Sequence, residues 1–513
     1  MAEWFKAAVL KTVVRPRTGG SNPSRSADNP TFLIQSYNYV MEEICIMWFR
    51  QDLRLNDNPA LIEANNSGIK ILPVYILDDV NSSNWKIGSA SRWWLNESLK
   101  KLNDSLNNNL CFMNGDSIKC LDNLISTYNV KSVYFNKCYE PWRIQSDEKI
   151  INFLSSKGIK TFLLNGSLLF EPESAMKEDG TPYKVFTPFY RKGCLQNSPE
   201  PRIPLEVPKN IKFLKHEELH LEELELLPKI NWYKNFKDEW SPGESGAREK
   251  LNQFLQLGIN DYKDGRNFPS KNNVSRLSPH LHHGEISPNT VWYEVKEKAE
   301  TMDSYRDGDH YLSELGWREF SYNLLYFFPY LPNENLQRKF DNFPWEENNE
   351  LLIKWQKGET GYPIVDAGMR ELWKTGYLHN RVRMIVGSFL VKNLLLHWHH
   401  GQEWFWETLV DADLANNSAS WQWVSGSGAD AAPYFRIFNP VTQGEKFDPN
   451  GDYIKHYIPE LKNLNGKFLY APWEAPESVL QAAGIELGKN YPNPIVDLKL
   501  SREKALAAFE KLK

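Results

Sequence analysis

Short apolar runs alternate with helix-like stretches between residues 44 and 164, and this alternation constrains the fold more than any other feature. The runs with the length and composition of buried strands are Ile44–Phe49, Ile69–Ile76, Lys131–Phe135 and Lys160–Leu164, with a weaker one at Leu110–Met113. The stretches with helical periodicity are Asn58–Asn65, Ser91–Leu106, Ile118–Tyr128 and Ile144–Lys157. Strands joined through helices predict an α/β domain with a parallel, Rossmann-like sheet.

Polar residues follow the ends of these strands, where parallel sheets usually bind their ligands. They are Arg50, Gln51, Asp52, Asp78, Asp79, Asn114, Tyr139 and Glu140. No GxGxxG turn follows the first strand, and the chain has no P-loop. We therefore expect neither nicotinamide nor nucleoside-triphosphate chemistry at this edge.

The rest of the chain has a different character. Glu171–Ser241 is rich in Pro, Lys and Glu with little regular pattern, which is typical of a connector. Helical patterns then dominate, at Ala247–Leu257, Pro288–Lys296, Tyr305–Tyr326, Asn349–Lys357, Ile364–Thr375, Arg381–Trp398, Gln402–Thr408 and Ser501–Leu512. We predict an α/β domain over 41–170, a connector over 171–241 and an all-helical domain over 242–513.

Composition limits the function classes. The chain of 513 residues is 41% hydrophobic and 24% charged, which excludes a fibrous or largely disordered protein. No apolar stretch approaches the roughly 18 residues of a membrane span, so we expect no membrane contact. Because the net charge is −5, a site for a polyanion has to be a local basic surface.

The five cysteines all precede residue 195 and form no CxxC pair. An odd, scattered set disfavours a disulfide framework and cysteine-ligated metal sites, and it fits a reducing compartment. We predict no metal site and a cytoplasmic location.

The segment Met1–Val40 has no usable periodicity. Its Gly20-Ser21-Asn22-Pro23 is what the usual T-arm sequence of a tRNA gene encodes. We predict that residues 1–40 are a non-native or disordered extension, read through from an upstream tRNA gene, and that the functional start is Met41.

Two motifs carry groups that bind ligands. Ser275–Pro279 (SRLSP), with Tyr262 before it and Gly284–Pro288 after it, places hydroxyls and a guanidinium before a helix start, where a diphosphate can bind. Ser313–Phe320 (SELGWREF) places a carboxylate beside an indole on one helix face, a pair suited to a flat, hydrogen-bonding ring. Helix capping and a surface ion pair beside a core tryptophan are the plainer interpretations.

Polar and aromatic residues also gather after residue 379. Asn380 and Met384 lie one helical turn apart, and Asp411, Asp413, Asn417, Trp421 and Trp423 follow. Burying so many polar groups among Leu- and Ile-rich helices is costly without a large polar partner. The pattern therefore indicates a bound polar ligand.

Long motifs in a fixed order make the chain similar to the photolyase/cryptochrome family from about Ile44 to Leu461. They are Trp48–Arg54, SRLSP, SELGWREF, Gly361–Arg370, Asp430–Asn439 and Gln443–Asp448. Within the family, the chain most resembles bacterial class I cyclobutane pyrimidine dimer (CPD) DNA photolyases. The resemblance implies light-driven repair, in which an electron passes from excited, reduced FAD to a flipped-out dimer in damaged DNA and returns once the ring has split.

The resemblance also implies a cofactor site in the helical domain. Carried over residue by residue, it assigns FAD to Tyr262, Val274, Ser275, Arg276, Leu277, Ser278, Glu314, Trp317, Arg383, Asp411, Asp413 and Asn417. Val274 stands where Thr is common, so one phosphate hydroxyl is missing. Asp411 is expected to pair with Arg383, and Asn417 to face flavin N5.

For the dimer, the resemblance implies that Glu314 accepts from thymine N3–H with Asn380 beside it. Trp317 and Trp423 form aromatic walls, and Met384 is a soft apolar contact. Arg266 and Arg381 contact the flanking phosphates. These residues, with Asn417, make up the expected catalytic and DNA-binding set.

Nine of the 19 tryptophans lie between Trp317 and Trp423. Of these, Trp421, Trp398 and Trp345 match the three-step electron relay of the family, which runs from the flavin to the surface. Core filling remains the expectation for Trp355, Trp373, Trp404 and Trp406.

Other family members fit less well. A (6-4) photolyase would have histidines at the positions of Asn380 and Met384, and the iron–sulfur branch needs four cysteines in the helical domain. A cryptochrome-type blue-light sensor or single-strand-preferring DNA-binding flavoprotein is the runner-up, although only a short, folded-looking segment follows Leu461. A general flavin oxidoreductase would need a nicotinamide site, and the sequence has no motif for one.

Two expectations about partners complete the prediction. We expect a monomer that acts on damaged DNA. A second, antenna chromophore, folate or deazaflavin, is expected in the N-terminal domain, but Asp52, Glu140 and nearby Lys184 do not discriminate between pigments.

Overall fold

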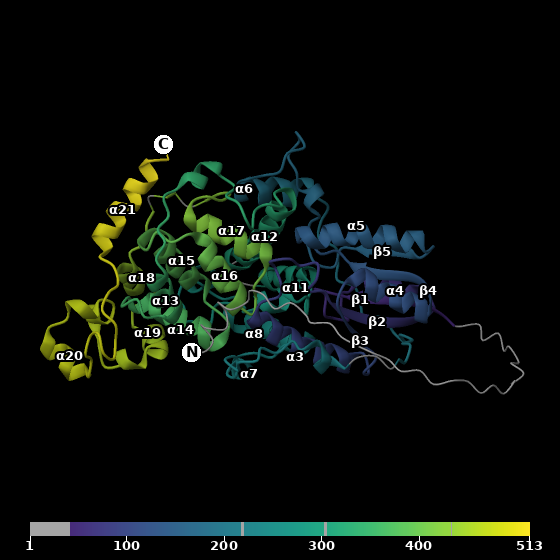
Figure 1. The fold of residues 1–513 in the computed structure, drawn as a ribbon, viewed down its shortest axis with the longest axis horizontal. Helices are drawn as coiled ribbons and strands as arrows, with labels where there is room; N and C mark the ends of the chain where they lie inside the picture. Colours follow the sequence, from purple (N-terminus) through teal and green to yellow (C-terminus); the bar gives the residue numbers. More distant parts are fainter. Residues whose placement is uncertain (1–41, 217–219, 302–304, 432, 435, 513) are drawn as a thin grey trace, which may run out of the picture.

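The computed structural model describes residues 42–216, 220–301, 305–431, 433–434 and 436–512. The predicted extension over 1–40 lies outside the described residues. The sheet lies toward one end of the molecule, and α20 (Glu477–Ala483) and α21 (Leu498–Glu510) lie at the other (Figure 1).

A five-stranded parallel sheet forms the N-terminal half, as predicted. Its strands are β1 (Glu43–Phe49), β2 (Lys70–Leu77), β3 (Cys111–Asn114), β4 (Asn129–Asn136) and β5 (Lys160–Leu164). Their order is β3-β2-β1-β4-β5, with every neighbouring pair parallel. The order reverses at β1, as in doubly wound nucleotide-binding sheets.

Helices cover both faces of this sheet. α2 (Pro59–Asn66) and α3 (Ser89–Ser105) share a core with Met47 and Phe49, whereas α4 (Ser117–Thr127) and α5 (Pro141–Ser156) share one with Ile46. Successive side chains of a strand point to opposite faces, so one short apolar strand serves both cores.

The predicted connector contains regular structure that its composition did not indicate. It forms η1 (Pro172–Ser174), α6 (Phe186–Pro188), the π-helix η2 (Phe189–Asn197), η3 (Leu221–Leu224) and α7 (Phe236–Glu239). Phe189 and Tyr190 are buried in the core of the helical half. These elements are too short to show a periodic pattern in the sequence.

The C-terminal half is helical, as predicted. Its elements are α8 (Glu244–Gln253), η4 (Phe254–Gly258), α9 (Tyr262–Gly265), α10 (Ser278–His282), α11 (Pro288–Glu300), α12 (Tyr305–Phe327), η5 (Arg338–Asn342), α13 (Asn349–Lys357), α14 (Pro363–Thr375), α15 (Asn380–Ser388), η6 (Phe389–Asn393), α16 (Trp398–Thr408), α17 (Leu414–Ser425), α18 (Pro440–Phe447), α19 (Asp452–Tyr457), η7 (Pro459–Leu461), η8 (Gly466–Leu469), η9 (Pro472–Glu474), α20 and α21. The domain boundaries of the sequence analysis stay predictions.

Two helix predictions were wrong. The single helix expected over Arg381–Trp398 is broken: π-helical η6 ends at Asn393, Leu395 has a φ of 56°, and α16 starts at Trp398. Helix α17 was not predicted, because its Asn and Ser residues have weak helix propensity and its buried face includes polar residues, among them Asn417, Ser418 and Gln422, so no apolar stripe marks it.

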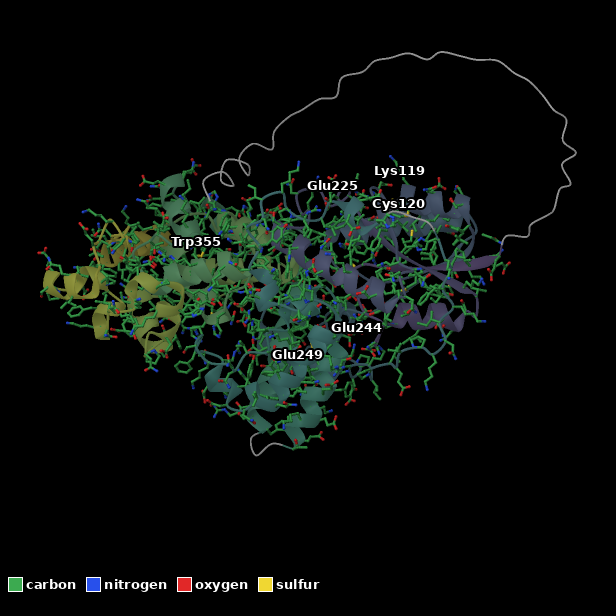
Figure 2. The ribbon with its side chains drawn as sticks, turned by 90° about the horizontal axis from the view of Figure 1, so that it is seen from below. Lys119, Cys120, Glu225, Glu244, Glu249 and Trp355 are labelled. Atoms are coloured by element: carbon green, nitrogen blue, oxygen red, sulfur yellow. The ribbon has the colours of Figure 1, made fainter. Side chains whose placement is uncertain are left out.

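The two halves are joined by close polar contacts. The Glu244 carboxylate accepts from the backbone N–H groups of Leu55 (2.8 Å) and Asn56 (3.0 Å), and Figure 2 labels Glu244 in the middle of the molecule. Gly284 has a φ of 71°, and a Cβ there would lie 2.0 Å from the Gln51 carbonyl oxygen. Glycine therefore permits the sheet edge to contact the helical half directly.

The segment after Leu461 folds back onto the helical half. The Tyr491 hydroxyl donates to Asp366 (2.9 Å), and Phe509 of α21 stacks on Tyr434 with ring centroids 4.6 Å apart. Within the described ranges, no helix has both the length and the apolar character needed to cross a bilayer. All five cysteines are free thiols.

Candidate active site

A cavity of about 560 Å³ lies among α12, α15 and α17, which pack together in the helical half (Figure 1). Its volume is in the range of small-molecule and cofactor pockets, roughly 300–1,000 Å³. The predicted site residues that line it are Tyr262, Arg266, Val274, Ser275, Arg276, Leu277, Ser278, Glu314, Trp317, Asn380, Arg383, Met384, Asp411, Asp413, Asn417, Trp421 and Trp423. Arg381, Trp398 and Trp345 do not line it.

Helical spacing explains this convergence. Glu314 and Trp317 lie one turn apart on α12, as do Asn380 and Met384 on α15, so each pair shares a face. On α17, Asn417 and Trp421 are likewise one turn apart. Side chains that are distant in the sequence therefore meet in one cavity.

The predicted ion pair between Arg383 and Asp411 is present. Arg383 Nη2 lies 3.0 and 2.8 Å from the two Asp411 carboxylate oxygens, and the Ser278 hydroxyl donates to the same carboxylate at 2.6 Å. Burial lowers the pKa of Arg383, but the charge of Asp411, the hydrogen bond to Asp411 and the smaller contributions of Tyr377 and Glu371 together outweigh it, so the net pKa is raised. The Arg383 guanidinium therefore stays charged at the cavity wall.

Asp413 is the N-cap of α17. Its carboxylate accepts from the Asn416 backbone N–H (2.8 Å) and from the Tyr322 hydroxyl, and His282 Nδ1 lies 3.4 Å away. Burial raises the pKa of Asp413, but the hydrogen bonds and the charge of His282 lower it to about 2. The carboxylate is therefore a fixed anion at the start of the helix that carries Asn417.

The SRLSP segment turns sharply at the cavity. Arg276 has a φ of 54°, which is uncommon for a residue with a side chain, and its guanidinium carbon lies 4.2 Å from the Trp240 ring centroid. The Tyr311 hydroxyl donates to Ser275 Oγ at 3.1 Å. Ser287, in the neighbouring motif, does not line the cavity: its hydroxyl caps α11 and bonds to Asp57 at the sheet edge.

Glu314 and Arg266 form an ion pair at the cavity, and His310 Nε2 lies 3.8 Å from the same carboxylate. The sequence analysis gave the two residues separate partners, the dimer and a phosphate. In the structure the carboxylate is already paired, so an occupant that uses it has to compete with Arg266.

Aromatic side chains form part of the wall. Trp317 stacks on Phe186 of the connector, with centroids 3.8 Å apart and planes 10° apart. Trp423 also lines the cavity and is half-buried. Sδ of Met384 accepts from Arg381 Nη1 at 3.7 Å, which places Arg381 next to the lining. Flat apolar surfaces thus adjoin the Glu314 carboxylate.

Asn417 and Trp421 mark the inner end of the cavity. The Asn417 amide donates to the Gln402 carbonyl at 3.0 Å, which fixes its orientation. A Cβ at Gly401 would lie 2.0 Å from the Trp421 ring, so only glycine admits this indole position. Beyond it, Trp398 is fully buried and its indole N–H donates to Asn335 at 3.0 Å, whereas Trp345 is half-buried.

The sequence analysis missed several lining or supporting residues. These are His282, Tyr311, Tyr322 and Tyr377. Each stands alone in the sequence, without a repeated spacing, and only the fold brings it to the cavity. Tyr322 lies two residues beyond SELGWREF on the same helix and eight residues after Glu314, so the helix face of Glu314 offered a weak signal.

The carboxyl edge of the sheet looks different. Arg50 pairs with Asp147 at 2.6 Å, Gln51 donates to Glu140 at 2.6 Å, and the cavity there measures about 50 Å³. Lys184 is not part of this edge: its ammonium lies 4.9 Å from the Phe328 ring. The prediction that Lys184 is near the strand ends was wrong, because the connector carries it to the helical half.

The lining of the large cavity fits FAD. Hydroxyls and a guanidinium suit phosphates, carboxylates and amides suit ribityl and ring groups, and aromatic walls suit a fused ring. Arg276 Nε is buried and has no hydrogen-bond partner within the described part of the chain. An additional acceptor in the cavity would satisfy it.

Known proteins share this architecture. Residues 45–209 match the family model described as DNA photolyase, and residues 311–511 match the FAD binding domain of DNA photolyase. A deoxyribodipyrimidine photo-lyase from Agrobacterium fabrum is 46% identical over 91% of this chain and 98% of that protein. Cryptochrome-1 from Arabidopsis thaliana is 36% identical over 91% of this chain and 70% of that protein.

A solved photolyase structure has the same fold. A bacterial class III photolyase from Agrobacterium tumefaciens superposes with a TM-score of 0.88 at 44% identity, covering 93% of this chain and 99% of that one. The expected resemblance to class I is therefore corrected: this comparison favours class III.

A parallel α/β domain joined to a helical domain with an FAD-type cavity defines a two-domain flavoprotein. The chain belongs to the photolyase/cryptochrome family.

Proposed function

We propose that this protein is a deoxyribodipyrimidine photo-lyase that repairs cyclobutane pyrimidine dimers in DNA with light, using FAD. One observation carries the proposal: a single cavity of about 560 Å³ contains both the FAD residues and the dimer residues inferred from the sequence. The relatives named photo-lyase support the same activity.

When bound and fully reduced, FAD supplies a light-excited electron to the dimer, which splits before the electron returns. The chain holds the cofactor through fixed charges. These are the Asp411 carboxylate, bonded to Ser278 and Arg383, and the Asp413 carboxylate at the start of α17. Asn417, whose amide donates to the Gln402 carbonyl, would present a neutral amide to the flavin ring.

The dimer needs an acceptor and flat walls. Glu314 would accept from a thymine N3–H, with Asn380 beside it, while Trp317 and Trp423 enclose the bases. Release of Arg266 from Glu314 would free the guanidinium for a flanking phosphate, next to Arg381. Substrate entry would thus exchange one ion pair for two separate contacts.

Trp421, Trp398 and Trp345 would carry electrons that restore reduced FAD. Trp421 lines the cavity, Trp398 is buried and Trp345 is half-buried. Of the three, Trp345 is the one that is partly exposed, so it would be the surface end of the relay. Indole suits the role because it is among the side chains most easily oxidised.

The direct test is a repair assay. The protein with fully reduced FAD is mixed with an oligonucleotide that contains one thymine dimer and exposed to near-UV or blue light. We expect restored thymine in the illuminated sample and none in the dark sample. No repair in the light would overturn the enzyme assignment and leave the cryptochrome-type sensor.

One observation that supports that alternative is the 36% identity to a plant cryptochrome. The chain spans 70% of that cryptochrome, and its own last segment is packed against Asp366 and Tyr434 rather than extended. The assay above separates the two functions, because a sensor would bind FAD without restoring thymine.

A second pigment, folate or deazaflavin, would lie in the α/β domain. The cavity at the sheet edge does not fit one as it stands: about 50 Å³ is far below the roughly 300 Å³ of small ligand pockets. Absorbance of the material released on denaturation would show whether one is bound.

We propose further that the protein is a cytoplasmic monomer. Five buried, free cysteines fit a reducing compartment. Light scattering after size-exclusion chromatography should give the mass of one chain, and a dimer mass would contradict the proposal.

A further inference from the structure

His397 lies between the second and third tryptophans of the relay. Its ring centroid is 5.6 Å from that of Trp398, nearly parallel at 27°, and 5.1 Å from that of Trp345, at 69°. One imidazole thus contacts both indoles. The sequence motifs did not include this residue.

The local backbone fixes the position of this ring. The chain leaves helical geometry after Asn393, and His397 becomes the N-cap of α16. Its Nδ1 accepts from the backbone N–H of His399 at 3.1 Å. A ring nitrogen that accepts a hydrogen bond carries no hydrogen, so the cap requires the uncharged imidazole.

Neighbouring groups favour the same state. Burial, followed by His399 and His400, lowers the pKa of His397 to about 4. The indole N–H of Trp398 donates to the neutral amide of Asn335. Glu346, next to Trp345, forms an ion pair with Lys504 of α21 at 3.9 Å.

We propose that His397 is an uncharged spacer of the relay, which keeps positive charge out of the gap so that an electron can pass from Trp345 to oxidised Trp398. This rests on the relay proposed above. The transfer breaks no bond: Trp398 regains its electron, Trp345 lacks one, and a small thiol in solution replaces it. His397 is a positioning residue, because it neither gains nor loses an electron.

The test compares His397→Phe with His397→Arg in the FAD-loaded protein. Both variants lose the cap, and both side chains pack against aromatic rings, but only Arg adds a charge. Transient absorption measures the yield of oxidised tryptophan that outlives the first recombination. We expect His397→Phe to stay within about twofold of the parent and His397→Arg to lose about tenfold or more, because a nearby like charge disfavours the tryptophan cation.

Controls separate this inference from the relay itself. His456→Arg, at an exposed histidine beside Tyr457 on α19, should leave the yield unchanged. If Trp398→Phe leaves photoreduction intact, the relay is wrong. If Trp398→Phe blocks photoreduction but His397→Arg, folded by circular dichroism, matches His397→Phe, the spacer inference alone is overturned. If His397→Arg does not fold, His397→Lys takes its place with the same expected loss.

Discussion

The large cavity and the carboxyl edge of the sheet are lined by similar charged groups but differ in the volume of the cavity that remains between them. At the sheet edge, Arg50 bonds to Asp147, and the cavity beside Arg50 measures about 50 Å³. In the helical half, Arg383 and Asp411 bond along one wall, and about 560 Å³ remains. An arginine–aspartate pair therefore lies at both sites, but the cavity of the helical half is about ten times larger.

This difference explains why strand-end position alone is a weak signal of a ligand. The fold rule places sites at the carboxyl ends of parallel strands. Here the residues at those ends mostly bond to one another and to the helical half, as Arg54 does with the Gly284 carbonyl at 2.9 Å. The edge acts as an interdomain joint, whereas the cavity retains room for a cofactor.

The largest effect is expected when each of the two ion pairs is broken by a substitution of its aspartate. Asp411→Ala leaves the partly buried Arg383 guanidinium without its partner at the cavity wall, a cost of about 3 kcal/mol, and should abolish FAD retention. Asp147→Ala has a similar cost at the sheet edge and should lower the melting temperature while FAD stays bound. The ratio of flavin absorbance to protein measures both. Equal flavin loss in the two variants would contradict the separation of the sites.

A second test compares a tryptophan of the proposed relay with a tryptophan near the sheet edge. Trp398→Phe should block photoreduction of oxidised FAD but spare repair by enzyme that has been reduced in advance. Trp406→Phe, whose parent indole donates to the Lys86 carbonyl at 2.7 Å near the sheet edge, should photoreduce normally. Steady-state absorbance under blue light records the rates. Loss in Trp406→Phe, with none in Trp398→Phe, would reverse the assignment.

A smaller effect concerns pH. The folded-state pKa of Asp413 is about 2, below an unfolded value of about 3.9. A depressed pKa stabilises the protein above the unfolded value, and this contribution disappears as pH falls from about 4 to 2. Asp413→Asn should therefore cost about 2 kcal/mol at pH 6 and progressively less toward pH 3.

Urea unfolding at several pH values measures this loss. Asp116→Asn, at the partly exposed cap of α4, is the matched variant on the sheet side and should cost less at pH 6. A gap between wild type and Asp413→Asn that stays constant down to pH 3 would show that the charge of Asp413 is not the stabilising feature.

The smallest expected effect is on DNA affinity. Arg381 lies beside the cavity with its guanidinium over Phe447. Arg381→Ala should weaken binding to damaged and to undamaged DNA by the same few-fold factor. The slope of log affinity against log salt should fall by about 0.9. Arg502→Ala, on exposed α21, should change neither quantity. Fluorescence anisotropy over a salt series gives the slopes, and a selective loss for damaged DNA would assign Arg381 to the lesion instead.

The sequence predicted the sheet closely, because each strand is a short apolar run between turn residues, as at Ile44–Phe49. It predicted only part of the candidate site. Residues in long motifs, such as Glu314 and Arg383, line the cavity as expected. Helix α17 was missed although it carries Asn417 and Trp421, because tertiary burial rather than local propensity forms it.

Hydrogen-bond partners that come from separate helices could not be predicted from the sequence either. Tyr322 and His282 bond to Asp413 from two other helices, and nothing in their spacing links the three residues. The break before α16 had the same origin: its cap, His397, is a residue type that N-caps seldom use. Such features depend on contacts between helices and emerge only in the folded chain.

The central claim is that this cavity performs light-driven repair, and its most direct test is repair by Glu314→Ala. The variant, with FAD fully reduced, is given a saturating amount of oligonucleotide with one thymine dimer, and restored thymine is counted per absorbed photon. Asp309→Ala, from the surface ion pair of α12 with Arg191, is the matched control. We expect a clear fall in repair yield for Glu314→Ala and none for Asp309→Ala. An unchanged yield in Glu314→Ala would contradict the placement of the dimer in this cavity.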